Sequence, residues 1–281
     1  MAKIVVTGGS GMLGREVIRE LLAHGREVLS LDRAAPKNDI CPSRIVDLTH
    51  PEEVARALSS TDGVIHLGAY QAPGIVSDPE TFGNNVTASY NVLDAAAANG
   101  VGRVVLASST AAFGFLYARK PIAPDYLPLD ELHPCRPQDP YALSKVVAET
   151  TADAFARLSD MAIYSLRFPG VNFEPDFRGF AERFQDPGVK LGRFWSYIDV
   201  RDAAAACRLA LEKPGRGHET LIVAAPTSTV AEPTDELLRR YFPGVKKARA
   251  ELRGNWSGVD SARAREVLGF QAQHVWEKYL R

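Results

Sequence analysis

The sequence predicts an α/β fold, a doubly wound parallel sheet with a small C-terminal lobe. Over roughly the first hundred residues, short apolar runs alternate with stretches of helical periodicity, the pattern of parallel strands covered by helices on both faces. A glycine-rich turn, TGGSGMLG, joins the first apolar run to the first helical stretch. Apolar residues make up 46% of the chain and charged residues 24%, which is the usage of an ordinary globular protein.

The expected elements follow one another in a regular order. The strand-like run KIVVTGG is followed by the helix GREVIRELLAHG, the strand EVLSLDR, the helix PEEVARALSS, the strand GVIHLGA, the helix NNVTASYNVLDAAAANG and the strand RVVLASS. Gly25 and Gly100 stand where helices should end, and Thr49 with Glu52 forms a T-x-x-E capping box. This alternation predicts βαβ units with parallel strands.

The glycine-rich turn predicts a dinucleotide site. Gly8, Gly11 and Gly14 form a G-x-x-G-x-x-G pattern just before a helix. Glycines there permit a tight turn and close approach of the backbone to a pyrophosphate, and the helix N-terminus offers N–H donors to the anion. A glycine-rich turn without a ligand is the alternative, so the next strand has to supply the context.

That strand ends in Asp32, close to the position where an acid accepts hydrogen bonds from an adenosine ribose. A carboxylate there repels a 2′-phosphate, so we predict NAD as the cofactor. NADP stays open because Arg33 or Arg15 could serve a 2′-phosphate. Asp47, after the third strand, is placed to approach an adenine edge or is a simple loop acid.

Proton chemistry is suggested by the segment DPYALSKVVAE. Tyr141 and Lys145 are four residues apart, so they share one face of a helix. A cation near a tyrosine favours its phenolate, which otherwise forms only near pH 10. Ser108, Ser109 and Thr110 end a strand at the edge where open α/β sheets bind ligands, although hydroxyls there can also cap backbone groups.

These segments together resemble the extended short-chain dehydrogenases/reductases, also called the NAD-dependent epimerase/dehydratase family. The matching pieces are TGGSGMLG, Asp32, HLGA, NNVTASYNVLDAA, ASSTAAFG, YALSK and LGRFWSYIDVRDAAAA, in family order over roughly residues 3 to 210. The resemblance implies a Rossmann-like fold and an enzyme that uses NAD. It also implies a homodimer built from the helices of the NNVTASYNVLDAAAANG and YALSKVVAETTADAFARL segments.

The resemblance also implies roles for individual residues. Tyr141 is the general acid/base, Lys145 holds the nicotinamide ribose and lowers the pKa of Tyr141, and Thr110 hydrogen-bonds the reacting oxygen. His66 is expected to pack beside NAD and not to act in catalysis. The cofactor-binding set is completed by residues of the turns and helices around these motifs: Met12, Leu13, Leu48, Leu67, Gly68, Ala69, Asn85 and Ser108.

Departures from the family pattern bear on the substrate. Ala111 and Ala112 stand where dehydratases carry an acidic pair, which disfavours a 4,6-dehydratase. In RFPGVNFEP, Gly170 replaces the asparagine of nucleotide-sugar epimerases and Asn172 is displaced, so the chain resembles the uronate dehydrogenases. By that resemblance, Arg193 would bind the carboxylate of the substrate; the alternative is that it pairs with an acidic residue on the surface. The expected substrate-binding residues are Gln71, Ser109, Asn172 and Arg193.

We therefore predict an NAD-dependent oxidoreductase acting on a secondary alcohol or ketone of a sugar, sugar acid or nucleotide sugar. The alternatives are a nucleotide-sugar epimerase with tightly bound NAD and a non-catalytic dinucleotide sensor. Residues 1–165 are expected to form the dinucleotide-binding core, with the Tyr141 helix. Residues 166–281 are expected to form mainly the substrate lobe, interleaved with the last core strand and helix at about 196–225.

Composition excludes several classes of function. The formal net charge is -1 and basic runs are short, so a nucleic-acid partner is not expected. The N-terminus enters a strand directly, with no basic region and long apolar segment, so we expect neither a signal peptide nor a membrane span. The three cysteines lack metal-site or disulfide spacing, which predicts no metal and a reducing, cytoplasmic location.

Overall fold

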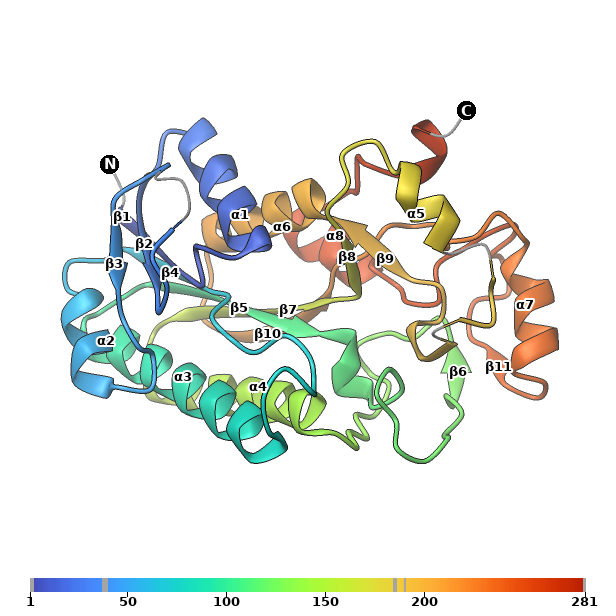
Figure 1. Cartoon of the computed structure of the whole chain (residues 1–281), viewed down its shortest axis with the longest axis horizontal. Helices are drawn as coiled ribbons and strands as arrows, with labels where there is room; N and C mark the ends of the chain where they lie inside the picture. Colours follow the sequence, from blue (N-terminus) through green and yellow to red (C-terminus); the bar gives the residue numbers. More distant parts are fainter. Residues whose placement is uncertain (1–2, 37–39, 184–185, 190, 280–281) are drawn as a thin grey trace.

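A seven-stranded parallel sheet forms the centre of the computed structural model, which describes residues 3–36, 40–183, 186–189 and 191–279 (Figure 1). The strand order is β10-β7-β5-β4-β1-β2-β3, and every pairing is parallel. The strand order reverses between β1 and β4, the point where open α/β sheets bind ligands. The strands are β1 (Lys3–Thr7), β2 (Glu27–Asp32), β3 (Ser43–Ile45), β4 (Gly63–His66), β5 (Arg103–Ser109), β7 (Ala162–Phe168) and β10 (Gly217–Ile222).

Helices cover both faces of the sheet, as the alternating pattern predicted (Figure 1). One face carries α1 (Met12–Ala23), α6 (Val200–Glu212) and α8 (Ala262–Leu268); the other carries α2 (Pro51–Ala57), α3 (Asp78–Ala98) and α4 (Pro140–Leu158). Neighbouring strand residues bury to opposite faces: Val6 packs in the core with α1 and α6, and Val5 in the core with α2 and α3. Burial on both faces explains why these strands are continuous apolar runs.

The helix ends test the local signals in the sequence. Gly25 and Gly100 follow helices α1 and α3 with φ of 71° and 68°, the left-handed conformation that glycine favours after a helix. The predicted capping box at Thr49 is wrong. The Thr49 backbone N–H and hydroxyl donate to Asp47 Oδ1 over 2.9 and 2.7 Å, and α2 begins two residues after Thr49, at Pro51, without a side-chain cap.

The C-terminal lobe is built on short elements and an aromatic core. Phe113, Phe115, Phe194 and Trp256 belong to one buried cluster there. None of the described helices is both long and apolar enough to cross a membrane. The remaining short elements are β6 (Tyr126–Leu127) paired with β11 (Lys246–Lys247), β8 (Gly170–Asn172) paired with β9 (Tyr197–Asp199), α5 (Arg178–Arg183), α7 (Thr234–Tyr241), and 3-10 turns at Thr110–Phe113, Leu191–Arg193 and Trp276–Lys278.

Candidate active site

A cavity of about 540 Å³ lies along the carboxyl ends of the central strands and reaches the lobe. This volume suits a ligand site of ordinary size. Most residues expected from the sequence line it: Gly8, Gly11, Met12, Leu13, Gly14, Asp32, Arg33, Asp47, Leu48, Leu67, Gly68, Ala69, Gln71, Ser108, Ser109, Tyr141, Lys145 and Arg193. Three expected residues, Asn85, Thr110 and Asn172, are not among its lining residues.

The glycine-rich turn forms a cradle of bare backbone at one end of the cavity. Gly8 has a φ of 70°, and a Cβ on it would lie 2.8 Å from the backbone nitrogen of Gly68. A Cβ on Gly14 would lie 2.2 Å from the carbonyl oxygen of Gly8. Helix α1 begins after Gly11, and no side chain caps it. Its first N–H groups and dipole therefore suit an anion such as a pyrophosphate, so the turn fits a dinucleotide.

Asp32 and Arg33 form the next part of the cavity wall. Asp32 Oδ2 accepts a hydrogen bond from the Ser10 backbone N–H over 3.0 Å, which ties the end of β2 to the glycine-rich turn. Arg33 Nη1 donates to the hydroxyl of Tyr70 over 2.7 Å, and its Cζ lies 4.5 Å from the centroid of that ring. Tyr70 in turn donates to Glu80 over 3.0 Å. The Arg33 guanidinium is thus held by Tyr70, which the sequence did not single out.

Tyr141 and Lys145 lie at the centre of the cavity wall. Burial raises the pKa of Tyr141 to about 12, although a hydrogen bond with Ser109 opposes this shift. Lys145 Nζ donates to the Ala107 carbonyl over 2.7 Å and lies 5.6 Å from the Tyr141 ring centroid. Burial lowers the pKa of Lys145 to about 8, and the charge of Glu149 opposes that shift. The expected lowering of the Tyr141 pKa is not found here, because desolvation of the phenolate dominates.

Ser109 occupies the position beside Tyr141 that the sequence analysis gave to Thr110. Ser109 is the last residue of β5, and its Oγ accepts from the Ala111 N–H over 3.1 Å and donates to the Phe168 carbonyl over 3.3 Å. Thr110 already begins the 3-10 turn and does not line the cavity. The chain turns directly after Ser109, so the third hydroxyl of the SST segment is not among the groups that line the cavity.

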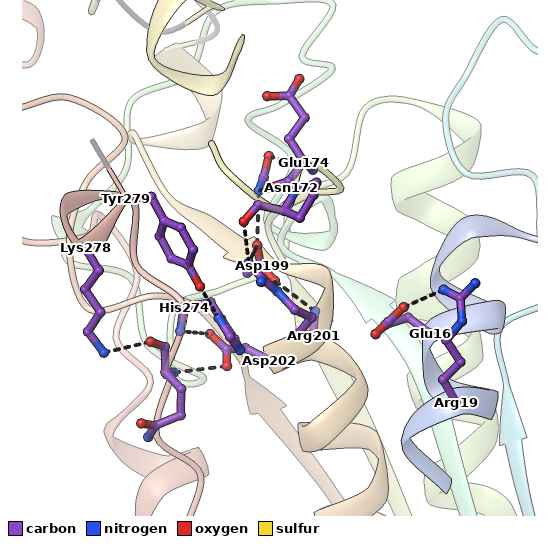
Figure 2. Close-up of polar contacts among 12 residues, drawn as sticks. Glu16, Arg19, Asn172, Glu174, Asp199, Arg201, Asp202, His274, Lys278 and Tyr279 are labelled. Carbon is purple, nitrogen blue, oxygen red and sulfur yellow. Dashed lines mark hydrogen bonds and ion pairs between the residues drawn. The ribbon is translucent and has the colours of Figure 1, made fainter. Parts of the chain in front are cut away.

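Asn172, expected to bind substrate, contacts a polar cluster outside the cavity (Figure 2). Its Nδ2 donates to Asp199 Oδ2 over 3.1 Å and to the Glu174 carbonyl over 2.8 Å. Its neighbours Val171 and Phe173 line the cavity. Side chains alternate along an extended strand, so Asn172 falls on the side of β8 away from its cavity-lining neighbours.

Asn85, expected near the cofactor, does not line the cavity but hydrogen-bonds to the backbone of Tyr70, which does. Its Oδ1 accepts from the Tyr70 backbone N–H over 2.9 Å, and its Nδ2 donates to the Tyr70 carbonyl over 3.0 Å and to Ser144 Oγ over 3.2 Å. His66 is also fully enclosed: its Nδ1 lies 2.7 Å from Thr7 Oγ1. Burial lowers the pKa of His66 to about 3, so this ring is neutral at physiological pH.

Arg193 projects from the lobe into the cavity, close to the backbone of Gly170. A Cβ on Gly170 would lie 2.5 Å from Arg193 Nη1, so the guanidinium fits in this position because residue 170 has no side chain. Arg193 Nε is buried and has no hydrogen-bond partner among the described residues. Burial lowers the pKa of Arg193, and the neighbouring Tyr117 opposes this shift. An under-paired guanidinium in a cavity favours an anionic ligand, above all a carboxylate.

Tyr117 also lines the cavity and was not identified from the sequence beyond its place in a long loop. Its ring meets that of Tyr141 edge to face, with centroids 6.1 Å apart. Burial raises the pKa of Tyr117, and the charge of Arg193 opposes the shift.

Within the described ranges, no group of three His, Cys, Asp or Glu side chains is arranged to hold a metal ion. The cavity is therefore lined by a glycine-rich turn, by the phenol of Tyr141 with Lys145 beside it, and by a guanidinium.

Comparison with protein-family models identifies one match, to the NAD dependent epimerase/dehydratase family over residues 4–184. The chain belongs to this family. The match spans well over half of the chain and confirms the family and the NAD-dependent enzyme class expected from the motifs. Members of this family are enzymes, and NAD is the cofactor in the family description.

Individual relatives carry different enzyme names. A UDP-glucose 4-epimerase of Streptococcus mutans is 25% identical over 96% of this chain and 92% of its own length. A uronate dehydrogenase of Agrobacterium fabrum is 32% identical over 54% of this chain and 55% of its own length. The chain spans only 62% and 50% of the length of two further curated relatives that it matches.

A solved structure shares the whole fold. A short-chain dehydrogenase/reductase superfamily protein from Agrobacterium tumefaciens, crystallised with bound NAD, has a TM-score of 0.75 at 24% sequence identity. The alignment covers 99% of this chain and 94% of that protein. At this identity the similarity establishes the fold, including the C-terminal lobe, and agrees with the Rossmann-like architecture expected from the sequence.

Proposed function

We propose that this protein is an NAD-dependent dehydrogenase that moves hydride between nicotinamide and a secondary alcohol or ketone of a sugar acid. The observation that carries the substrate class is Arg193. Its guanidinium lies next to Gly170, and its buried Nε has no hydrogen-bond partner among the described residues. Leaving a buried cationic donor unpaired costs free energy, and a substrate carboxylate would remove that cost.

The cofactor would lie between the glycine-rich turn and Tyr141. When bound, NAD supplies the carbon that accepts or returns hydride. The uncapped start of α1 suits its pyrophosphate, and Asp32, which lines the cavity, suits the adenosine ribose. Arg33 hydrogen-bonds to Tyr70, which leaves it less suited to a 2′-phosphate and supports NAD over NADP.

The proton is assigned to Tyr141. Burial keeps the phenol protonated at neutral pH, which suits it to donate a proton to a ketone oxygen as hydride arrives. In the reverse direction the phenolate form of Tyr141 takes the proton of the alcohol. Ser109, beside Tyr141, would hydrogen-bond the reacting oxygen, the role that the sequence analysis gave to Thr110. Lys145, as an ammonium, would stabilise the phenolate that forms.

An epimerase is the second candidate, supported by the names of relatives such as the S. mutans UDP-glucose 4-epimerase. Such an enzyme would run the same hydride step twice with no net redox change. The packing beside Gly170 supports the dehydrogenase. Arg193 occupies the volume that a larger side chain at position 170, such as the asparagine of nucleotide-sugar epimerases, would need.

We also propose a homodimer and a cytoplasmic location. Helices α3 and α4 pack against each other, and their exposed apolar side chains include Tyr90, Leu143 and Leu158. Apolar side chains on adjacent helices favour burial against a second copy. Cys135 and Cys207 have free thiols, which supports a reducing compartment.

The test is NADH formation, followed by absorbance, with NAD and three matched substrate groups: hexuronic acids, the corresponding neutral hexoses, and UDP-hexoses. We expect NADH only with the uronic acids, and a loss of kcat of about a hundredfold to ten-thousandfold in Tyr141→Phe. Equal rates with neutral hexoses would refute the role of Arg193. Tyr141-dependent inversion of a UDP-hexose without NADH, detected by NMR, would establish the epimerase instead.

A further inference from the structure

A buried ion pair lies next to the proton-transfer residues. Glu149 on α4 and Arg167 on β7 are only 7% and 6% exposed. Arg167 donates from Nε to Glu149 Oε1 over 2.9 Å and from Nη2 to Oε2 over 2.7 Å. A buried ion pair contributes little net stability, because removing two charges from water offsets their attraction. The proposed chemistry does not use this pair, so its location needs another explanation.

The pair is connected to the end of β5. Ser108 Oγ donates to Glu149 Oε1 over 2.6 Å. Ser108 stands between Ala107, whose carbonyl accepts from Lys145, and Ser109, which hydrogen-bonds with Tyr141. The Glu149 carboxylate therefore fixes the segment of β5 that contacts both members of the proton-transfer pair.

The negative charge of Glu149 also acts on Lys145. The two residues are one helical turn apart on α4, and the carboxylate opposes the desolvation that lowers the pKa of Lys145. Other titratable groups near this lysine are His66 on β4 and Tyr141 on α4. His66 is neutral, Tyr141 is protonated, and the charge of Arg167 is paired with Glu149. Within the described residues, Glu149 is thus the carboxylate that acts on Lys145.

We propose that Glu149 is a positioning residue of the active site, which keeps Lys145 in its ammonium form and, through Ser108, holds the end of β5 against α4. This inference rests on the proposed function only for its effect on turnover. The carboxylate would be retained because a lysine enclosed beside Tyr141 needs a nearby negative charge to stay protonated at neutral pH.

The direct test is the titration of Lys145, observed by NMR of protein labelled with 13C at the lysine Cε. The signal is assigned by its absence in Lys145→Met. We expect a midpoint near 8 in the wild type and a fall of about one pH unit in Glu149→Gln, a tenfold change in the acid dissociation constant. An unchanged midpoint would overturn the proposal.

Asp153→Asn is the matched control. Asp153 is the next residue along the same face of α4, and its side chain is 55% exposed. The substitution removes one carboxylate charge, as Glu149→Gln does, but it should leave the Lys145 midpoint where it is. An equal shift in both variants would mean that the effect is a general change of helix charge and would refute the specific role of Glu149.

Activity gives the second readout. With an accepted substrate, loss of activity at high pH should move to lower pH in Glu149→Gln by the same interval as the NMR midpoint, while KM for the substrate stays unchanged. Glu149→Asp, which restores the charge, should return the profile toward that of the wild type. The NMR titration needs no substrate, so it decides this proposal even if no substrate is turned over.

Glu149→Gln leaves Arg167 as an unpaired buried cation, which disfavours folding. A second variant therefore tests the proposal if Glu149→Gln does not fold. Glu149→Gln combined with Arg167→Gln removes both charges and keeps two side chains that can hydrogen-bond. Because Glu149 supplies the negative charge that acts on Lys145, the midpoint should still fall. A wild-type midpoint in this double variant would equally refute the proposal.

Discussion

Two hydrogen-bonded clusters lie along helix α4, and only one of them opens into a cavity. In the open cluster, Tyr141 hydrogen-bonds with Ser109 at the end of β5, and Lys145 donates to the carbonyl of the adjacent Ala107. Tyr141, Lys145 and Ser109 all line the cavity. The closed cluster lies two turns further along the helix. There, His218 on β10 has its Nδ1 2.7 Å from Asp153 Oδ1 and its Nε2 2.8 Å from Ser165 Oγ.

The closed cluster has the order of groups that hydrolases use for nucleophilic attack, a carboxylate, a histidine and a serine. Ser165, however, is 0% exposed in the middle of β7, and the His218 side chain is 4% exposed. No substrate can reach the serine hydroxyl, so these hydrogen bonds join α4, β7 and β10 without chemistry. Access to a cavity, and not the set of residue types, separates the two clusters.

Removing one hydroxyl from each cluster tests this difference most strongly. Ser109→Ala should lower kcat about a hundredfold, because it removes a donor to the reacting oxygen. Ser165→Ala should leave kcat unchanged and lower only the free energy of unfolding. Steady-state kinetics and urea denaturation measure the two effects. Thr110→Val is the neighbouring control, and a larger loss of kcat there than in Ser109→Ala would restore the assignment made from the sequence.

The part of the same cavity that is formed by Arg193 can be tested through Gly170. A methyl group there should push the Arg193 guanidinium aside, so Gly170→Ala should raise KM for a uronic acid about tenfold, with little change in kcat. Gly83→Ala is the control, since nothing lies within 4 Å of a Cβ at that helical position. If KM is the same in Gly170→Ala and the wild type, Arg193 does not bind the substrate carboxylate.

The closed cluster should respond only in stability. His218→Ala leaves Ser165 and Asp153 without this partner and should lower the free energy of unfolding by about 1–3 kcal/mol, with kcat and KM unchanged. Thermal and urea unfolding of the variant, compared with its turnover, provide the measurement. A loss of turnover in the folded variant would show that the closed cluster is coupled to the active site after all.

Local signals in the sequence were sufficient for much of the site. The spacing of Tyr141 and Lys145 follows from helix periodicity, and the glycines before α1 follow from the close approach of backbone segments. The left-handed Gly25 and Gly100 were identified for the same kind of reason, because each signal involves only a few consecutive residues. The family itself followed from several such motifs in the right order.

Features that depend on competing partners could not be predicted. Thr49 hydrogen-bonds to Asp47 and does not cap α2, and Asn172 hydrogen-bonds to Asp199 and does not reach the cavity. Neither choice is visible in the sequence, because the competing acceptor comes from the turn geometry or from another strand. Ser109 is the residue of the SST segment that hydrogen-bonds with Tyr141, because the exact residue at which β5 ends is set by the surrounding packing.

The sequence by itself determined the order of elements, the glycine-rich turn before α1 and the placing of Tyr141 and Lys145 on one helix face, since these rest on short-range periodicity and backbone freedom. Only the tertiary structure decided which hydroxyl faces Tyr141, which way burial moves its pKa, and that Arg193 shares the space beside Gly170. Desolvation and access depend on segments far apart in the chain, so they exist only once the sheet, the helices and the lobe have come together.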